Sequence, residues 1–236
     1  MKVGCCGWSY FGKKKGFKSV LQSYASVYDC VEINSTFYRI PKTKTAERWR
    51  SEVNEVNPSF EFSVKCNKTI THIIKFGKKS VKIFDSMKEI CKALNSRILL
   101  FQTPASFKPT EGNIKRMKSF FENIDRENLT LVWESRGEWR KSPEKVKEVC
   151  KMFDLSDCVD PLRSDPVYFG KKKLLYFRLH GFGFPSMYSY TFNEDELKEV
   201  AKRAKKIKVG EKWILFNNSD MYDNAVQFIS ILKNLG

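Results

Sequence analysis

The amino-acid sequence predicts an α/β fold, a single (β/α)8 TIM-like barrel that occupies residues 1–236 as one domain. Short apolar runs of strand-forming residues alternate with amphipathic helical patterns along the whole chain. Eight such units fit into 236 residues without a linker or a change of composition. The alternative, a doubly wound open sheet, normally has fewer strands and a Gly-rich phosphate-binding turn, and the sequence contains no G-x-G-x-x-G or Walker-type loop.

The expected strands are apolar almost throughout, which is typical of parallel strands covered on both faces. They are Val3–Gly7, Cys30–Ile33, Glu61–Lys65, Arg97–Phe101, Leu129–Glu134, Ser156–Asp160, Leu174–Leu179 and Lys212–Asn217. Between them, an apolar stripe with the spacing i, i+3, i+4, i+7 predicts helices with one buried face. Such stripes are Phe17/Val20/Leu21/Tyr24, Val146/Val149/Cys150/Phe153 and Ala225/Phe228/Ile229/Leu232.

Helix start signals agree with this pattern. Ser142 is followed by Pro143, which suits the first position of a helix, and Asn193 precedes three acidic residues. One unit is irregular, because Pro161–Lys173, between the sixth and seventh strands, contains two prolines and no helical stripe. We expect a loop or a single turn there.

The connections have unequal lengths. Those that enter a strand are short, whereas several that leave a strand are long: Trp8–Lys15, Asn34–Lys44, Cys66–Lys79 and His180–Phe192. In a (β/α)8 barrel the latter all lie at the C-terminal mouth, where active sites form. The sequence therefore predicts that this face carries the function.

Composition narrows the class of protein. The chain has 43 Lys and Arg against 27 Asp and Glu, a net charge of +16, and it is 42% hydrophobic, which argues against disorder. No apolar run approaches the roughly 20 residues of a membrane span, and the N-terminus lacks a signal-peptide core. Seven cysteines without a Cys-x-x-Cys pair do not resemble a disulfide framework or a zinc site. We expect a cytoplasmic protein with no membrane contact and no disulfide-linked partner.

Polar residues end several of the expected strands, where their side chains point into the mouth. They are Glu32, Asn34, Lys65, Gln102, Glu134, Arg136, Asp160, Arg178, His180, Asn217 and Asn218. These residues could pair with one another and only hold the rim together. Burying so many charges is costly without a use, however, so a polar, ion-paired pocket is the favoured interpretation.

The charged residues among these strand ends suggest specific roles. We expect the basic ones to hold an anion such as phosphate: Lys65, Arg136 and Arg178. The acidic ones offer an alternative oxygen-rich site for Mg²⁺ or Mn²⁺, although nearby positive charge opposes it and no cofactor is required: Glu32, Glu134 and Asp160.

For catalysis, Glu32 or Glu134 is expected to act as general base and His180 as general acid. His72 contributes only if its loop folds over the mouth. Further substrate contacts are expected from Trp8, Asn34, Tyr38, His72, Asn217 and Asn218.

Aromatic residues accompany lysines in the expected mouth loops. Tyr10 and Phe11 precede three lysines, and five aromatic residues crowd His180–Phe192. Rings among basic side chains can stack on bases and hold a phosphate backbone. The plainer alternative is that the rings anchor the loops and the lysines keep the surface solvated.

Seven sequence blocks lie at or near the expected strand ends: Gly7-Trp8-Ser9-Tyr10, Val31–Pro41, Phe62–Lys65, Ile70–His72, Glu134–Arg136, Tyr176–Gly181 and Phe216–Asn218. Together they resemble the YecE-like domain-of-unknown-function-72 family, in the family's order. The resemblance covers essentially the whole chain and implies a TIM-like barrel with these blocks at its mouth. It implies no activity, and the loop after His180 looks shorter than the family pattern.

The leading hypothesis is a hydrolase-type enzyme that acts on a phosphoester in an anionic small molecule, a nucleotide or a nucleic acid. One alternative is a non-catalytic basic module that binds nucleic acid. Another is a carbohydrate-active hydrolase that uses Glu32 and Glu134 as a carboxylate pair. That alternative requires the two carboxyl groups to lie about 5 Å or about 6.5–9.5 Å apart, with no arginine between them.

Overall fold

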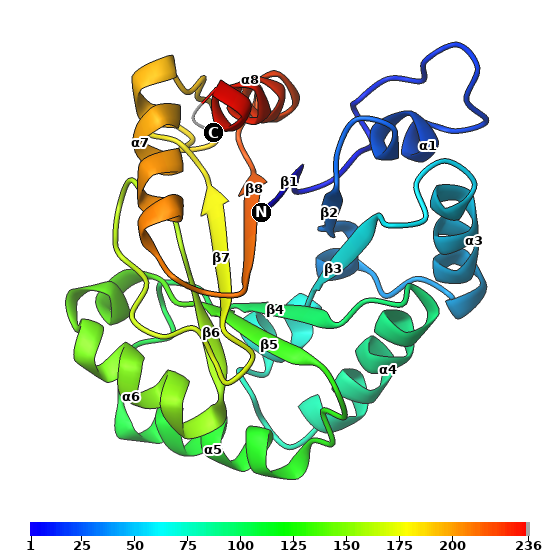
Figure 1. The fold of residues 1–236 in the computed structure, drawn as a ribbon. Helices are drawn as coiled ribbons and strands as arrows, with labels where there is room; N and C mark the ends of the chain where they lie inside the picture. Colours follow the sequence, from blue (N-terminus) through cyan, green and yellow to red (C-terminus); the bar gives the residue numbers. More distant parts are fainter. Residues whose placement is uncertain (235–236) are drawn as a thin grey trace.

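A computed structural model of the chain describes residues 1–234 and contains a closed barrel of eight parallel strands (Figure 1). The strands are β1 (Lys2–Cys5), β2 (Cys30–Ile33), β3 (Glu61–Lys65), β4 (Ile98–Gln102), β5 (Thr130–Glu134), β6 (Leu155–Val159), β7 (Leu174–Leu179) and β8 (Glu211–Phe216). They pair in sequence order, and β8 closes the barrel on β1 with Leu215 opposite Gly4. The predicted (β/α)8 barrel is confirmed, and each strand lies within two residues of its expected bounds.

Helices cover the outside of the barrel (Figure 1). They are α1 (Val20–Ala25), α2 (Ser35–Tyr38), α3 (Thr43–Asn54), the π-helix η1 (Thr69–Ile73), α4 (Ser80–Ala93), α5 (Glu111–Asn123), the 3-10 helix η2 (Gly137–Lys141), α6 (Pro143–Phe153), α7 (Glu194–Lys206) and α8 (Met221–Asn234). The stripe predicted for α6 is buried at all four positions. The stripe expected from Phe17 was wrong at its start, because Ser19 caps α1 and leaves Phe17 in the preceding loop.

The start signals are confirmed in α6 and α7. Pro143 is the first residue of α6, although the Ser142 side chain makes no capping hydrogen bond. Asn193 and Glu196 form a reciprocal capping box at the start of α7, with both hydrogen bonds at 2.9 Å. The irregular unit is also confirmed, since residues 161–173 contain turns and one bridge from Phe169 to Ser156.

The core has two parts. The larger part lies between the strands and the helices and includes most of the buried aromatic residues. The smaller part fills the barrel interior with Cys6, Cys30, Ile98, Leu100, Val132, Cys158, Leu174, Tyr176, Trp213 and Leu215. Because strand side chains alternate between faces, the next inward positions towards the C-terminal ends are Glu32, Gln102, Glu134 and Arg178. The interior is therefore apolar in its lower part and charged at the mouth.

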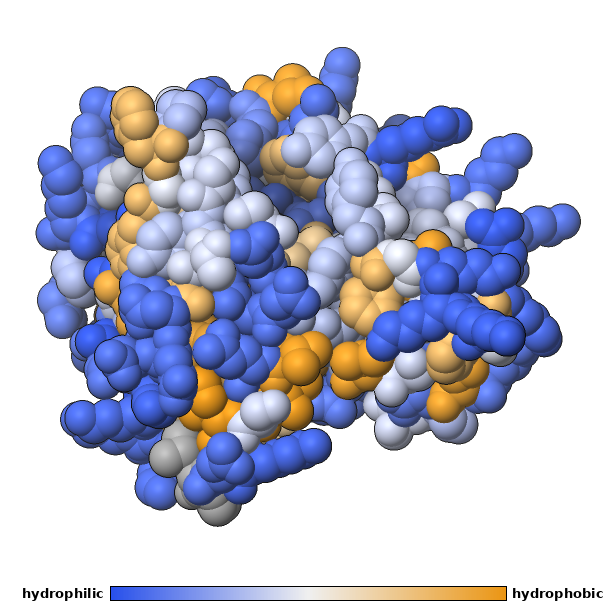
Figure 2. Space-filling view, turned by 90° about the horizontal axis from the view of Figure 1, so that it is seen from above, coloured by the Kyte–Doolittle hydropathy of each residue, from blue (hydrophilic) through white to orange (hydrophobic). Residues whose placement is uncertain are grey.

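The surface carries most of the excess positive charge. In Figure 2, hydrophilic side chains project around the edge of the face in view. Lys202, on α7, is exposed, as are most lysines of the helices. None of the helices within residues 1–234 has the length and apolar character that a membrane span requires. All seven cysteines are buried as free thiols.

Candidate active site

A charged layer at the C-terminal end of the barrel interior forms the candidate site. Its centre is Arg178 of β7, which is fully buried and bridges two carboxylates. Arg178 Nη2 donates to Glu32 Oε1 at 2.8 Å, and Nη1 donates to Glu134 Oε2. Tyr176 Oη donates to the other oxygen of Glu32 at 2.9 Å. One guanidinium thus connects β2 with β5 across the barrel.

This bridge excludes a carbohydrate-active hydrolase that uses Glu32 and Glu134 as a carboxylate pair. An arginine lies between Glu32 and Glu134, which was the condition that excludes a glycosidase-like pair. Glu32 is also completely buried, so its carboxylate is not positioned to contact a sugar.

Glu134 has both oxygens occupied. Oε1 accepts from Gln102 Nε2 at 2.8 Å and from Arg136 Nε at 2.7 Å, while Oε2 accepts from Arg178. Burial alone would raise the pKa of Glu134, but Arg178, His180 and Arg136 together hold it well below its usual value. The carboxylate therefore stays ionised and anchors its cationic neighbours, which makes it a poor general base.

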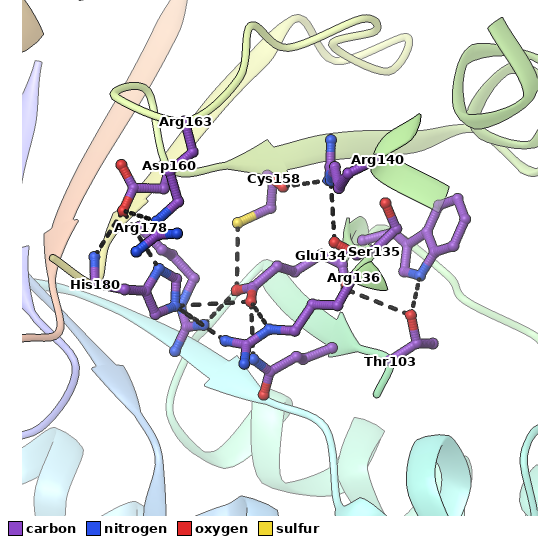
Figure 3. Close-up of polar contacts among 12 residues, drawn as sticks. Thr103, Glu134, Ser135, Arg136, Arg140, Cys158, Asp160, Arg163, Arg178 and His180 are labelled. Carbon is purple, nitrogen blue, oxygen red and sulfur yellow. Dashed lines mark hydrogen bonds and ion pairs between the residues drawn. The ribbon is translucent and has the colours of Figure 1, made fainter. Parts of the chain in front are cut away.

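His180 is held in one tautomer by its surroundings. Its Nε2 lies 3.2 Å from Nη2 of Arg136 and 3.2 Å from Nη1 of Arg178. Guanidinium nitrogens only donate, so Nε2 is the acceptor and Nδ1 carries the proton. Nδ1 faces Asp160 Oδ2 at 3.8 Å, and the same oxygen accepts the backbone N–H of His180 at 2.9 Å. Figure 3 shows Arg136, Arg178 and His180 converging on Glu134.

A cavity of about 420 Å³ opens beside this cluster, between the loops that follow β5, β6 and β7. Its polar lining consists of Glu134, Ser135, Arg136, Arg140, Asp160, Arg163, Ser164 and His180. Arg140 is committed to Asp157 by two hydrogen bonds, but within residues 1–234 the Nη1 groups of Arg136 and Arg163 have no partner. Ser135 also lines the cavity, but its hydroxyl is buried from solvent and has no partner within the same residues.

A groove of about 820 Å³ lies at the opposite end of the barrel. Its basic residues are largely neutralised, because Lys2 pairs with Glu61, and Arg97 pairs with Glu61 and Glu211. In a (β/α)8 barrel this end contributes to stability, whereas the mouth carries chemistry. The smaller cavity is therefore the better candidate.

Lys65 and His72 lie on the β2–β3 side of the mouth. Lys65 Nζ is 4.3 Å from the centroid of the Phe37 ring, and the His72 ring packs edge-on against the same ring at 4.9 Å. The η1 loop thus brings His72 to the mouth. Burial, followed by the charges of Lys65 and Arg136, lowers the pKa of His72 to about 4, so the imidazole is neutral at pH 7.

The remaining expected residues have mostly structural contacts. Asn34 Nδ2 donates to the Cys6 carbonyl at 3.0 Å, and Asn218 Nδ2 donates to Tyr190 O and Asn224 Oδ1 at 2.8 Å. Trp8 packs edge-on against Trp49, Asn217 is half-buried, and Tyr38 is exposed at the rim. These positions surround the mouth, but none of them joins the Glu134–Arg178 cluster.

The metal alternative does not fit the observed donors. Glu32 and Glu134 are each bound to Arg178, and Asp160 accepts from His180 and pairs with Arg163. Within residues 1–234 no group of three or more His, Cys, Asp or Glu side chains is arranged to hold a metal ion.

The sequence did not indicate three residues of this site, Tyr176, Ser135 and Arg163. Tyr176 could have been found, because it shares the two-residue period of Arg178 and His180 along one strand. Ser135 and Arg163 lie in loops, where no periodicity indicates the direction of a side chain.

Eight parallel strands that enclose a charged, ion-paired layer define a TIM-barrel protein with that layer at its C-terminal mouth. The family model described as "Protein of unknown function DUF72" matches residues 2–235. The chain therefore belongs to this family, and the resemblance seen in the sequence motifs is confirmed.

Known relatives match this chain over nearly its whole length. UPF0759 protein YunF of Bacillus subtilis (strain 168) is 23% identical, over 98% of this chain and 94% of the relative. DUF72 family proteins from Enterococcus faecalis V583 and Thermotoga maritima MSB8 have the same fold, with TM-scores of 0.78 and 0.77 and identities of 22% and 23%. Each covers 98% of this chain, and this chain covers 97% and 98% of them, respectively.

Proposed function

We propose that this protein is an enzyme that binds a phosphate-bearing substrate in the mouth cavity and cleaves a phosphoester there. The observation that carries the proposal is the pair of unused Nη1 groups, on Arg136 and Arg163, in one cavity with His180. Arginine forks match phosphate oxygens, and a site with spare cationic donors favours an anion. The substrate class is a nucleotide or a nucleic acid, in keeping with the net charge of +16.

The buried and accessible charges have different roles in this proposal. Arg178 has both Nη groups occupied by carboxylates, so it positions Glu134 and His180 and does not hold the anion. Arg136 is partly exposed and donates to Glu134 only through Nε, which leaves one side of its guanidinium for substrate. Among the residues expected from the sequence to bind the anion, Lys65, Arg136 and Arg178, Arg136 therefore keeps that role in the proposal, Arg178 does not, and Arg163 is added.

His180 is the proposed proton-transfer group. Its Nε2 accepts from both Arg136 and Arg178, so an anion that draws Arg136 away leaves Arg178 as the donor to Nε2 and brings the ring next to the substrate. Asp160 faces Nδ1 and keeps the ring oriented, as the carboxylate does in other acid–base histidines.

Hydrolysis of bis(p-nitrophenyl) phosphate and p-nitrophenyl phosphate, with and without Mg²⁺ or Mn²⁺, tests this function. We expect turnover that falls about 10²- to 10⁴-fold in His180→Asn, since general acid–base groups typically contribute that much. Lys202→Met, on the outer face of α7, is the control for lost surface charge and should leave turnover unchanged. Equal rates in wild type, His180→Asn and a no-enzyme blank would contradict the proposal.

A second candidate function, a non-catalytic module that binds nucleic acid, is favoured by exposed rings on the mouth loops. Tyr10 and Phe184 are 90% and 94% exposed, and Lys68 lies over the exposed Tyr38 ring at 5.5 Å. Bases stack on such rings while lysines hold the backbone. It predicts that affinity for a fluorescent single-stranded oligonucleotide falls steeply with salt and with Phe184→Ala. Affinity that is insensitive to both would exclude it.

A further inference from the structure

Lys65 differs from the other basic residues of the charged layer. Arg136 and Arg178 both pair with Glu134, but within residues 1–234 no carboxylate or other acceptor binds the Lys65 ammonium. Its contact is the Phe37 ring, 4.3 Å away. Glu32 and Glu134, the acids on the same inner face, are already bound to Arg178. Within the described residues, Lys65 is therefore an amine without a direct ion pair or hydrogen bond.

The structure holds the base of this side chain rigidly at the mouth. Lys65 is the last residue of β3, and its carbonyl accepts from Thr36 Oγ1 at 2.7 Å. The Thr36 carbonyl in turn accepts from Asn67 Nδ2 at 2.9 Å. The side chain is 8% exposed, so its direction is set by packing and only a small part of it meets solvent.

The electrostatic setting weakens the hold on the ammonium proton. Burial, followed by the charge of Arg178, lowers the pKa of Lys65 to about 8, although Glu32 and Glu134 oppose the shift. At pH 8 about half of the amine is therefore unprotonated, compared with less than about 1% for a lysine of ordinary pKa. A desolvated lysine beside another cation is a recognised form of activated nucleophile.

The amine and the anion-binding arginine border the same inner face of the mouth. Lys65 follows Ser63 by two residues in β3, and Ser63 Oγ contacts Tyr176 Oη of that face at 2.7 Å. Arg136 donates to Glu134, which belongs to the same face, at 2.7 Å. A small molecule held by Arg136 therefore lies over the face from which the Lys65 side chain projects.

We propose that Lys65 is a covalent nucleophile that forms an imine with an aldehyde or ketone bearing a phosphate or carboxylate group. The amine lone pair attacks the carbonyl carbon, and the oxygen takes up a proton to give a carbinolamine. Loss of water then leaves a C=N bond, with no oxidant or reductant needed. The inference rests on the proposed function only for the anionic group, which Arg136 holds.

Pyridoxal 5′-phosphate, an aldehyde with a phosphate group, is a suitable probe. The protein is incubated with it, reduced with borohydride to fix any imine, digested, and analysed by mass spectrometry. We expect Lys65 to be modified at least about tenfold faster than the exposed Lys202, with a pH midpoint near 8. Lys65→Arg, which keeps the charge, should abolish the mouth adduct, and Lys202→Arg is the matched control that should retain it.

Two further arms separate this inference from the proposed function. Pyridoxal, which lacks the phosphate, and the variant Arg136→Met should both slow the modification of Lys65. If Lys65 reacts as fast with pyridoxal and in Arg136→Met as it does with pyridoxal 5′-phosphate in the wild type, imine formation by Lys65 is supported and anion binding by Arg136 is contradicted. If inorganic phosphate binds in an Arg136-dependent manner but Lys65 reacts no faster than Lys202, the imine is overturned and the proposed function remains.

Discussion

Replacing Arg178 with methionine is predicted to destabilise the barrel strongly, because it breaks two buried ion pairs, leaving Glu32 without its ion-pair partner and Glu134 with Arg136 alone. Glu32 is fully buried and Glu134 is nearly so, and both depend on the same guanidinium. Breaking a buried ion pair costs about 3–5 kcal/mol, and two carboxylates place this case at the upper end. For a chain of 236 residues that corresponds to a fall in Tm of about 10–20 °C.

Arg97→Met is the matched control. Arg97 also bridges two glutamates, Glu61 at 3.0 Å and Glu211 at 2.6 Å, but its side chain is half exposed at the opposite end of the barrel. Exposed pairs contribute about 1 kcal/mol or less. The free energy of unfolding is measured by urea denaturation at pH 7, followed by circular dichroism. Equal losses in the two variants would refute the reasoning that burial makes the Arg178 bridge important.

The pH dependence of the stability lost in Arg178→Met gives an independent check of the role of the buried ion pairs. In the wild type, the depressed pKa of Glu134 stabilises the fold above the unfolded pKa of about 4.3, and this contribution is lost as pH falls through the folded value. Without Arg178, the largest of the charges that lower the pKa of Glu134 is lost, so the carboxyl takes up a proton at a higher pH than in the wild type and protonation relieves part of the cost. The gap between wild type and Arg178→Met should therefore narrow between pH 7 and pH 4. A gap that stays constant would contradict the account.

Three further predictions concern stability, each measured by urea denaturation. Lys65 has a pKa of about 8, below its ordinary 10.5, so its charge costs stability below pH 8 and the cost vanishes as pH rises through 10.5. Lys65→Met should accordingly be more stable than wild type at pH 7, by about 3 kcal/mol at most, and the gain should shrink by pH 10; a loss at pH 7 would contradict this. Asn193→Ala removes the capping box of α7 and should cost about 1 kcal/mol, and no change would argue against the box. Gly181 has φ +90°, and a Cβ there would lie 2.3 Å from Tyr190 Cβ, so Gly181→Ala should cost about 1–3 kcal/mol; a neutral effect would refute the clash.

The fold and the strand-end residues were predictable because both depend on periodicity. Continuous apolar runs identify parallel strands, and the residue that ends such a run reaches the mouth whatever its partners are. Glu32, Glu134 and Arg178 were placed at the mouth in this way, and the structure has them there.

Their partners were not predictable. Arg178 reaches across the barrel to residues 146 and 44 positions away in the chain, and no local pattern encodes that choice. The sequence therefore indicated that Arg178 is at the mouth but not that carboxylates occupy it. Loop residues such as Arg163 were not predicted as site residues for a related reason, because loops have no periodicity that fixes the direction of a side chain.

We expect the mouth cavity, and not the lysine-rich surface, to bind the phosphate of the substrate. The most direct measurement is a crystal structure of the protein soaked with adenosine 5′-monophosphate. Phosphate density is expected within hydrogen-bond distance, about 3 Å, of the Nη1 groups of Arg136 and Arg163 and next to His180. Phosphate found only on surface lysines such as Lys202, with the mouth free of ligand, would contradict it.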